Sequence, residues 1–216
     1  MSFAEITQAF VDGMKHTSWL EYIAVFAGIG SVWFSRVENI LVYPIGLIST
    51  IIYVFLSFQY HLIGEAGVNI YYSVLSIYGW YLWAKKNEQQ ETILHITHSN
   101  KKDLLQQVTF FAILYITIYY SLIYLKTFFY PGVIPFGDAF ASATAFTGMW
   151  LMAKKKVESW MWWILTNIAS VPLYFLKGLV FTSFYYFVLL IMAFFGLIEW
   201  RKRARTKTYT LKAIKA

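Results

Sequence analysis

The stretch Val157–Tyr174 carries polar and aromatic side chains inside an otherwise apolar segment. Residues three or four positions apart share one face of a helix. The side chains that would share this face come from Trp160, Trp163, Asn167, Ser170 and Tyr174. A carboxamide buried in hydrocarbon without a partner costs roughly 2–7 kcal/mol. The pattern therefore predicts one of two roles, a site for a flat polar molecule or hydrogen bonds that join membrane helices.

A second stripe of this kind lies between residues 69 and 83. One helical face would carry Asn69, Tyr72, Ser76, Gly79 and Trp83, with Trp80 beside them. A glycine on such a face allows close approach of a ligand, or of another helix. Because two separate segments present amide and aromatic groups in the same way, we favour a binding site over helix contacts.

Several other kinds of chemistry are excluded by what the chain lacks. It has no cysteine, so disulfides, thiolate metal sites and cysteine nucleophiles are absent. No carboxylate lies clearly in the middle of an apolar segment, where proton-coupled and ion-coupled sites need one. His95 and His98 have no third ligand nearby. There is no helical His/Glu motif and no glycine-rich phosphate loop, so we expect neither an enzyme nor a metal or cofactor.

Composition predicts an all-α integral membrane protein. The chain is 59% apolar and only 13% charged, whereas soluble domains carry about 25% charged residues. Spanning a bilayer takes roughly 20 mostly apolar residues. Seven segments fit, at about 19–35, 40–60, 66–84, 104–126, 136–153, 160–176 and 179–199. An apolar stripe from Phe3 to Met14 predicts a short amphipathic helix that lies on the membrane surface before the first span.

The basic residues predict the orientation in the membrane. Cytoplasmic loops are enriched in Lys and Arg. If the C-terminus is cytoplasmic, seven spans place 15 of the 18 basic residues inside and the N-terminus outside. The net charge of +7 then reflects membrane topology. We therefore expect the lipid bilayer as a partner and no nucleic acid.

The sequence also repeats with a shift of 117 residues. The matching pairs are Trp33 and Trp150, Gly79 and Gly196, and Trp83 and Trp200. Three spans, a linker span and three more spans make a parallel repeat, as in some secondary transporters. The expected parts are 1–17, an N-terminal helix; 18–84, the first repeat; 85–102, a cytoplasmic loop; 103–130, a linker span; 131–200, the second repeat; and 201–216, a basic tail.

Substrate sites in such transporters lie near the midplane between the repeats. A slip of one residue in the middle helix would place Ser49 opposite Asn167. Ten residues before the two repeat glycines stand Asn69 and Tyr186. The candidate substrate-binding residues are Trp163, Asn167, Tyr186, Asn69, Tyr72, Trp80, Ser49 and Trp160. We interpret Trp33 as a packing residue, and Arg36 with Glu38 as a solvated turn.

The sequence resembles the PnuC family of bacterial vitamin transporters, which are relatives of the SWEET sugar transporters. The resemblance is carried by YGWYLW (78–83), VESWMWWILTN (157–167) and IPFGD (134–138), and it extends over roughly 19–203. It implies a SWEET-like fold, a homotrimer in the bacterial inner membrane and one substrate in the centre of each protomer. Two positions depart from the pattern of nicotinamide riboside members, since Asn69 replaces a common Gln and Ser49 a common Asn.

The resemblance implies uptake of nicotinamide riboside by facilitated diffusion, with the product trapped by intracellular phosphorylation. Thiamine or another nucleoside-like vitamin is the alternative within the family. Both vitamins are flat cations, which indole faces hold by cation–π attraction worth about 2 kcal/mol or more when desolvated. A receptor-like or structural membrane protein is the alternative from another class, and it would not need a polar ring shared between two repeats.

Overall fold

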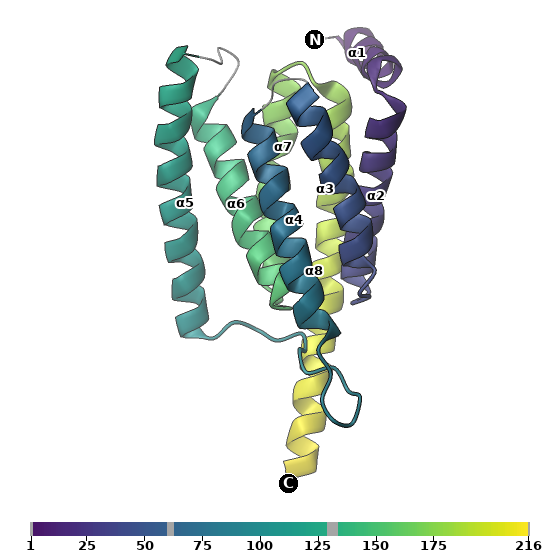
Figure 1. Ribbon diagram of the computed structural model, residues 1–216, viewed down its shortest axis with the longest axis vertical. Coiled ribbons are helices and arrows are strands. Elements are labelled where there is room, and N and C mark those ends of the chain that lie inside the picture. The colour runs from purple at the N-terminus through teal and green to yellow at the C-terminus, as the bar shows by residue number, and fades with distance from the viewer. Residues whose placement is uncertain (1, 60–62, 129–133, 216) are drawn as a thin grey trace.

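The computed structural model describes residues 2–59, 63–128 and 134–215, and the regular structure in these residues is helical. The helices are α1 Phe3–His16, α2 Trp19–Arg36, α3 Val42–Gln59, α4 Ile63–Ala84, α5 Lys101–Phe128, α6 Pro135–Ala153, α7 Ser159–Leu176 and α8 Val180–Lys215 (Figure 1). Isolated β-bridges join Lys86 to Thr92 and Thr97 to Lys156. The prediction of an all-α protein is confirmed.

Three of the described helices are long and apolar enough to cross a bilayer by length and hydropathy. The qualifying segments are Val42–Gln59 in α3, Lys101–Lys126 in α5 and Val180–Thr206 in α8. These helices are typical of an integral membrane protein. The predicted number of seven spans is larger, because it also counts helices whose polar side chains lower their hydropathy.

Helix α1 begins at a capping box, in which Ser2 and Glu5 each accept a hydrogen bond from the other's backbone N–H. None of its residues is buried. Its Phe10 ring packs against the rings of Phe181 and Phe184 in α8, at 5.6 and 5.4 Å between ring centroids. The predicted amphipathic N-terminal helix is therefore present, docked through Phe10 on the start of α8.

The shift of 117 residues relates the structure of the two halves as well as their sequences. Helix α7 begins and ends 117 residues after α3. The turns before these helices also match, because Asn39 N–H donates to the Phe34 carbonyl and Lys156 N–H to the Leu151 carbonyl. No slip is needed in the middle helix. The prediction that Ser49 lies opposite Asn167 is therefore wrong, and the shift pairs Ser49 with Thr166.

An aromatic ring packed on a glycine fixes this register in each half. In the first half the Tyr43 ring lies so close to Gly79 that a Cβ there would be 2.5 Å from ring atoms. The same ring meets Trp83 edge-to-face, with centroids 5.2 Å apart. The corresponding residues of the second half are Trp160, Gly196 and Trp200, with a 2.5 Å approach and 5.6 Å between the indole centroids. If the helix that carries the ring shifted by one residue against the helix that carries the glycine, the ring would meet a side chain in place of the glycine. The close packing of ring on backbone would then be lost.

Helices α2, α3 and α4 pack in sequence, as do α6, α7 and α8. The two groups meet where α4 contacts α6 and where α2 contacts α8, while α5 packs on α6 at the edge of the bundle (Figure 1). We call the end that holds the turns 37–41 and 154–158 the inner end. The main hydrophobic core lies there, around the rings of Tyr43, Trp83, Trp160 and Trp200.

Candidate functional site

Asn167 lies in α7 with only 3% of its surface exposed. The Asn167 side chain forms no hydrogen bond with any of the described residues. The neighbouring Thr166 does join two helices, since its hydroxyl donates to Thr144 Oγ1 of α6 at 3.0 Å. Buried polar groups in folded proteins nearly always have a partner. Of these two neighbours, Thr166 therefore makes the helix contact, while the Asn167 carboxamide has no partner among the described residues.

The indole of Trp163 lies one turn before Asn167 and faces α6 and α4. A Cβ on Gly148 of α6 would lie 3.3 Å from the indole nitrogen, so this glycine lets the ring approach the helix backbone. The Tyr72 ring of α4 meets the indole with centroids 6.1 Å apart. Trp163 and Tyr72 come from different halves, and the structure brings these two predicted site residues together.

Tyrosines of α7 and α8 form a second aromatic group. Tyr186 stacks on Tyr174 with centroids 5.0 Å apart and an interplanar angle of 13°. Tyr185 packs edge-on against Tyr186 at 5.5 Å. The predicted residue Tyr186 therefore lies at the centre of a group of three packed tyrosines.

Tyr185 is a site candidate that the sequence analysis missed. Its hydroxyl oxygen lies 2.7 Å from the place that a Cβ on Gly28 would occupy, and the Ser49 Oγ lies 3.3 Å from the same point. Tyr185 thus reaches from α8 into the first half and lies beside Ser49. The sequence does contain a signal for it, Gly28. This glycine lies in the middle of an apolar helix, where it neither makes a turn nor caps an end.

Asn69 is partly engaged by its own helix. Its Nδ2 donates to the Glu65 carbonyl at 2.9 Å, which leaves the second Nδ2 hydrogen and the amide oxygen for other partners. In the next turn, the Ser73 hydroxyl lies 2.8 Å from the Thr50 hydroxyl and joins α4 to α3. The structure therefore places Asn69 on α4 one helical turn from the residue that links it to α3.

Three residues lie elsewhere than predicted. Trp160 is 1% exposed and fills the space above Gly196 in the inner-end core. Trp80 is 40% exposed, because it follows Gly79 and so points about 100° away from the packed face. Neither stays in the candidate site. Trp33, predicted as a packing residue, is 51% exposed.

Residues that are 117 positions apart touch each other at the inner end. The Ser35 hydroxyl donates to the Met152 sulfur at 2.9 Å, and the Lys155 Nζ lies 2.7 Å from Glu38 Oε1. The rings of Trp83 and Trp200 meet at 6.1 Å. We call these six residues the inner-end seal. Equivalent residues of two halves meet only on the axis that relates them, so these contacts lie on that axis.

The seal corrects the interpretation of Glu38 as part of a solvated turn. Its carboxylate pairs with Lys155, whose side chain is 4% exposed, and also lies 3.4 Å from the Arg203 Nη1. The Lys155 Nζ lies 4.5 Å from the centroid of the Trp83 ring. Glu38 and Lys155 both adopt positive φ, at 60° and 49°. Such angles are uncommon outside glycine, and here they occur at the same point of two equivalent turns.

The loop between α4 and α5 covers the second of these turns. Thr97 N–H donates to the Lys155 carbonyl, and Val157 N–H donates to the Thr97 carbonyl, both at 3.1 Å. Ser99 donates to the Glu158 carboxylate from its backbone and its hydroxyl, at 2.9 and 2.7 Å. Burial alone would raise the pKa of Glu158, but the hydrogen bonds from Ser99 and His98 outweigh it and hold the pKa below its usual range. In the described part of the chain, no three His, Cys, Asp or Glu side chains are grouped to hold a metal ion.

The comparisons with known proteins agree with this architecture. The nicotinamide riboside transporter PnuC of Escherichia coli is 25% identical over 213 residues, 88% of each chain. The riboflavin/roseoflavin transporter RibM of Streptomyces davaonensis is 23% identical over 205 residues, 92% of each chain. The crystal structure of the vitamin B3 transporter PnuC superposes with a TM-score of 0.66 at 22% identity, covering 94% of this chain and 89% of that one, so the folds are alike. The sequence model of the nicotinamide mononucleotide transporter family matches residues 18–202. The chain therefore belongs to this family of membrane transporters, the PnuC family.

Proposed function

We propose that the protein carries nicotinamide riboside across the membrane and binds it between the two halves. The unpaired carboxamide of Asn167 beside the Trp163 indole carries this proposal. Nicotinamide is a flat cationic ring in the riboside and bears a carboxamide of its own. Trp163 and Tyr72 would stack on the ring. Asn167 would exchange hydrogen bonds with the substrate amide, and Tyr186, Ser49 and Asn69 would complete the lining.

The proposed architecture has seven spans, α2 to α8, as two parallel three-helix repeats joined by α5. The positions of the basic residues support a cytoplasmic inner end with an external N-terminus, in the bacterial inner membrane. The parts 1–17, 18–84, 85–102, 103–130, 131–200 and 201–216 then serve as surface helix, first repeat, loop, linker span, second repeat and tail. By resemblance to the family we propose a homotrimer with one site in each protomer.

The proposed mechanism is facilitated diffusion by alternating access. The residues proposed to line the site are aromatic or uncharged, so they offer no carboxylate for proton or sodium coupling. Net uptake would then require that the substrate is consumed inside, as phosphorylation by a kinase would do. Glu38 and Lys155 are paired at the inner end, and in the proposed mechanism the step that releases substrate inward would separate them.

Riboflavin is the second candidate substrate. The relative RibM, named as a riboflavin/roseoflavin transporter, matches this chain over a slightly larger share than PnuC of Escherichia coli does. Riboflavin is also flat and rich in hydrogen-bonding groups. Thiamine remains the alternative from the sequence analysis. Titration of the purified protein with each vitamin by calorimetry ranks the three directly.

The test compares Asn167→Leu with Thr166→Val, a matched variant of the adjacent residue. Loss of the substrate hydrogen bond costs roughly 1–3 kcal/mol, so Asn167→Leu should weaken nicotinamide riboside binding about ten- to a hundredfold with little change in melting temperature. Thr166→Val removes the bond to Thr144 and should lower the melting temperature with nearly normal affinity. Normal affinity in a stable Asn167→Leu protein would show that the site lies elsewhere.

A further inference from the structure

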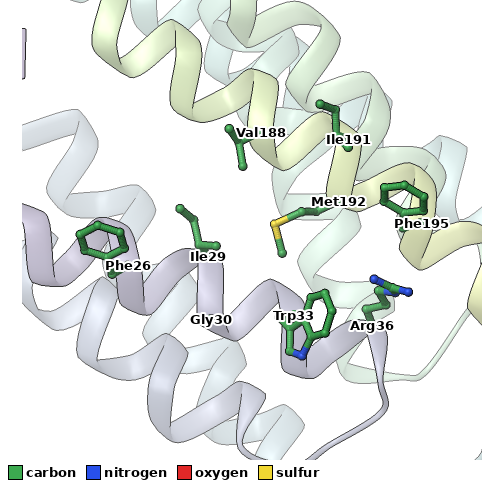
Figure 2. Close-up of a pocket in the computed structure, with 9 residues that line it drawn as sticks. All are labelled: Phe26, Ile29, Gly30, Trp33, Arg36, Val188, Ile191, Met192 and Phe195. Carbon is green, nitrogen blue, oxygen red and sulfur yellow. The ribbon is translucent and has the colours of Figure 1, made fainter. Parts of the chain in front are cut away.

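A groove of about 530 Å³ lies on the surface between α2 and α8. Figure 2 shows its walls, which are apolar side chains of both helices, with Met192 pointing into it between Ile29 and Trp33. Its one charged lining residue is Arg36, at the end of α2. The exposed side chain of Trp33 belongs to this groove, which accounts for its position outside the core.

The groove has the length of one bilayer leaflet. Its lining on α2 runs from Phe26 to Arg36, a separation of ten positions, or about 15 Å at 1.5 Å per residue. The hydrocarbon layer is about 30 Å thick. Nearer the outer end, Phe10 of α1 covers the start of α8 through Phe181 and Phe184. The groove therefore has the dimensions of one acyl chain lying in the inner half of the membrane.

Arg36 supplies a cation at the inner end of the groove. Its guanidinium carbon lies 4.9 Å from the centroid of the Trp33 ring and 5.4 Å from that of Phe195. Its Nε is buried without a hydrogen-bond partner. No carboxylate of the described residues pairs with it, since nearby Glu199 pairs with Arg203 at 2.8 Å. Arg36 itself lines the groove, so an anion at this point would pair with its guanidinium charge.

The same face of α8 continues beyond the groove as a basic stripe. Ile198 follows Phe195 by one turn, and Lys202 and Arg205 follow at the spacing of one helical face. The side chains of all three are exposed. Apolar walls that lead to Arg36 and then to further cations match an acyl chain that ends in an anionic headgroup. An apolar helix of another protein would fill the groove but leave the Arg36 charge without an anion.

We propose that this groove binds an anionic glycerophospholipid, with one acyl chain between α2 and α8 and its phosphate at Arg36. Guanidinium groups bind phosphate oxygens through paired hydrogen bonds. The cytoplasmic leaflet carries the anionic lipids that attract basic residues next to a membrane span. The lipid would also close the seam between α2 and α8, where the two halves meet.

The test uses the purified protein in an uncharged detergent. Dioleoyl phosphatidylglycerol and dioleoyl phosphatidylcholine, which share their acyl chains, are added separately, and bound lipid is counted by native mass spectrometry alongside melting curves. The wild type should retain phosphatidylglycerol in preference and melt higher with it. Arg36→Gln should lose that preference, with an affinity for phosphatidylglycerol about ten- to a hundredfold lower. Arg36→Lys should keep part of it, and inorganic phosphate alone should not stabilise the protein.

Two further variants separate the groove from general charge effects. Met192→Trp should weaken binding of both lipids, because the larger ring fills the groove. Lys154→Gln is the matched control, since this cation lies over the Trp150 ring at the equivalent turn of the second half but outside the groove. An unchanged lipid preference in Arg36→Gln, or an equal loss in Lys154→Gln, overturns the proposal. A wild type that retains no lipid, and whose oligomer dissociates in Met192→Trp, assigns the groove to a second copy of the chain instead.

Discussion

Replacing Glu38 by Gln should loosen the inner-end seal. The Lys155 Nζ lies 2.7 Å from this carboxylate, and its side chain is 4% exposed. Breaking a buried ion pair by removing one partner costs about 3–5 kcal/mol. Lys155 keeps its contact with the Trp83 ring, and Glu38 is 23% exposed, so the net loss should be smaller, about 2 kcal/mol. At 1.36 kcal/mol per factor of ten, this corresponds to an open fraction about thirtyfold larger.

The absence of cysteine makes this change measurable by thiol labelling. Ser35→Cys places a single thiol at a position that is 3% exposed and lies on the axis between the halves. A soluble maleimide reaches it only when the seal opens. In detergent, the labelling rate should rise about thirtyfold when Glu38→Gln is added to this background. Glu91→Gln, at an exposed loop carboxylate, is the control and should leave the rate unchanged.

The reasoning would be refuted by an unchanged labelling rate in a Glu38→Gln protein that melts like its parent. Such a result would mean that the ion pair persists when the inner end opens, or that the seal does not open. Global unfolding could also raise the labelling rate. The control for it is Ala24→Cys in α2, a buried position outside the seal, where unfolding would raise labelling equally. The expected outcome is faster labelling at position 35 and none at position 24.

Three further predictions concern stability. Gly79→Ala forces a methyl group into an aromatic ring and should lower the free energy of unfolding by about 1–3 kcal/mol. Gly67→Ala, with no atom within 4 Å of the new Cβ, should be tolerated. Melting curves of the two variants test this difference. Trp160→Ala should lower the free energy of unfolding by about 3–5 kcal/mol, and Trp33→Ala clearly less, because the Trp33 side chain is half-exposed. Equal losses of melting temperature in the two variants would contradict the assignment of Trp33 to the groove. Because the folded-state pKa of Glu158 is lowered, its stabilisation is present above its ordinary value of 4.5 and is lost as the pH falls through the folded-state pKa. Glu158→Gln should flatten that acid limb of the melting temperature, and an identical limb in the variant would assign it to other groups.

Local patterns in the sequence predicted the helices well, because each apolar run of membrane length has few alternatives to a helix. The 117-residue shift likewise came from residues that the fold truly equates, such as Gly79 and Gly196. The family followed from motifs around Trp163 and Asn167. These predictions succeeded because they depend on spacing within one segment, or on comparison of two whole segments.

The misplaced residues show what spacing does not contain. Trp160 and Asn167 share a face of α7, but seven residues separate them by about 10 Å along the helix, so Trp160 lies in the inner-end core and Asn167 does not. The pair of Glu38 and Lys155 joins two loops. A helical pattern predicts which residues share a face, but it is silent on which partner that face meets at each depth and on which loops touch.

The exact shift also explains how two equivalent halves make a site without twofold symmetry. Two identical glutamates would repel each other on the axis, whereas a duplicated chain places Glu38 against Lys155. In the middle helices the shift pairs Thr50 with Asn167. Thr50 joins its own half together through Ser73, while Asn167 leaves its amide free. The proposed site would therefore offer a carboxamide on one side and hydroxyls on the other, an arrangement that suits an asymmetric ring such as that of the proposed substrate.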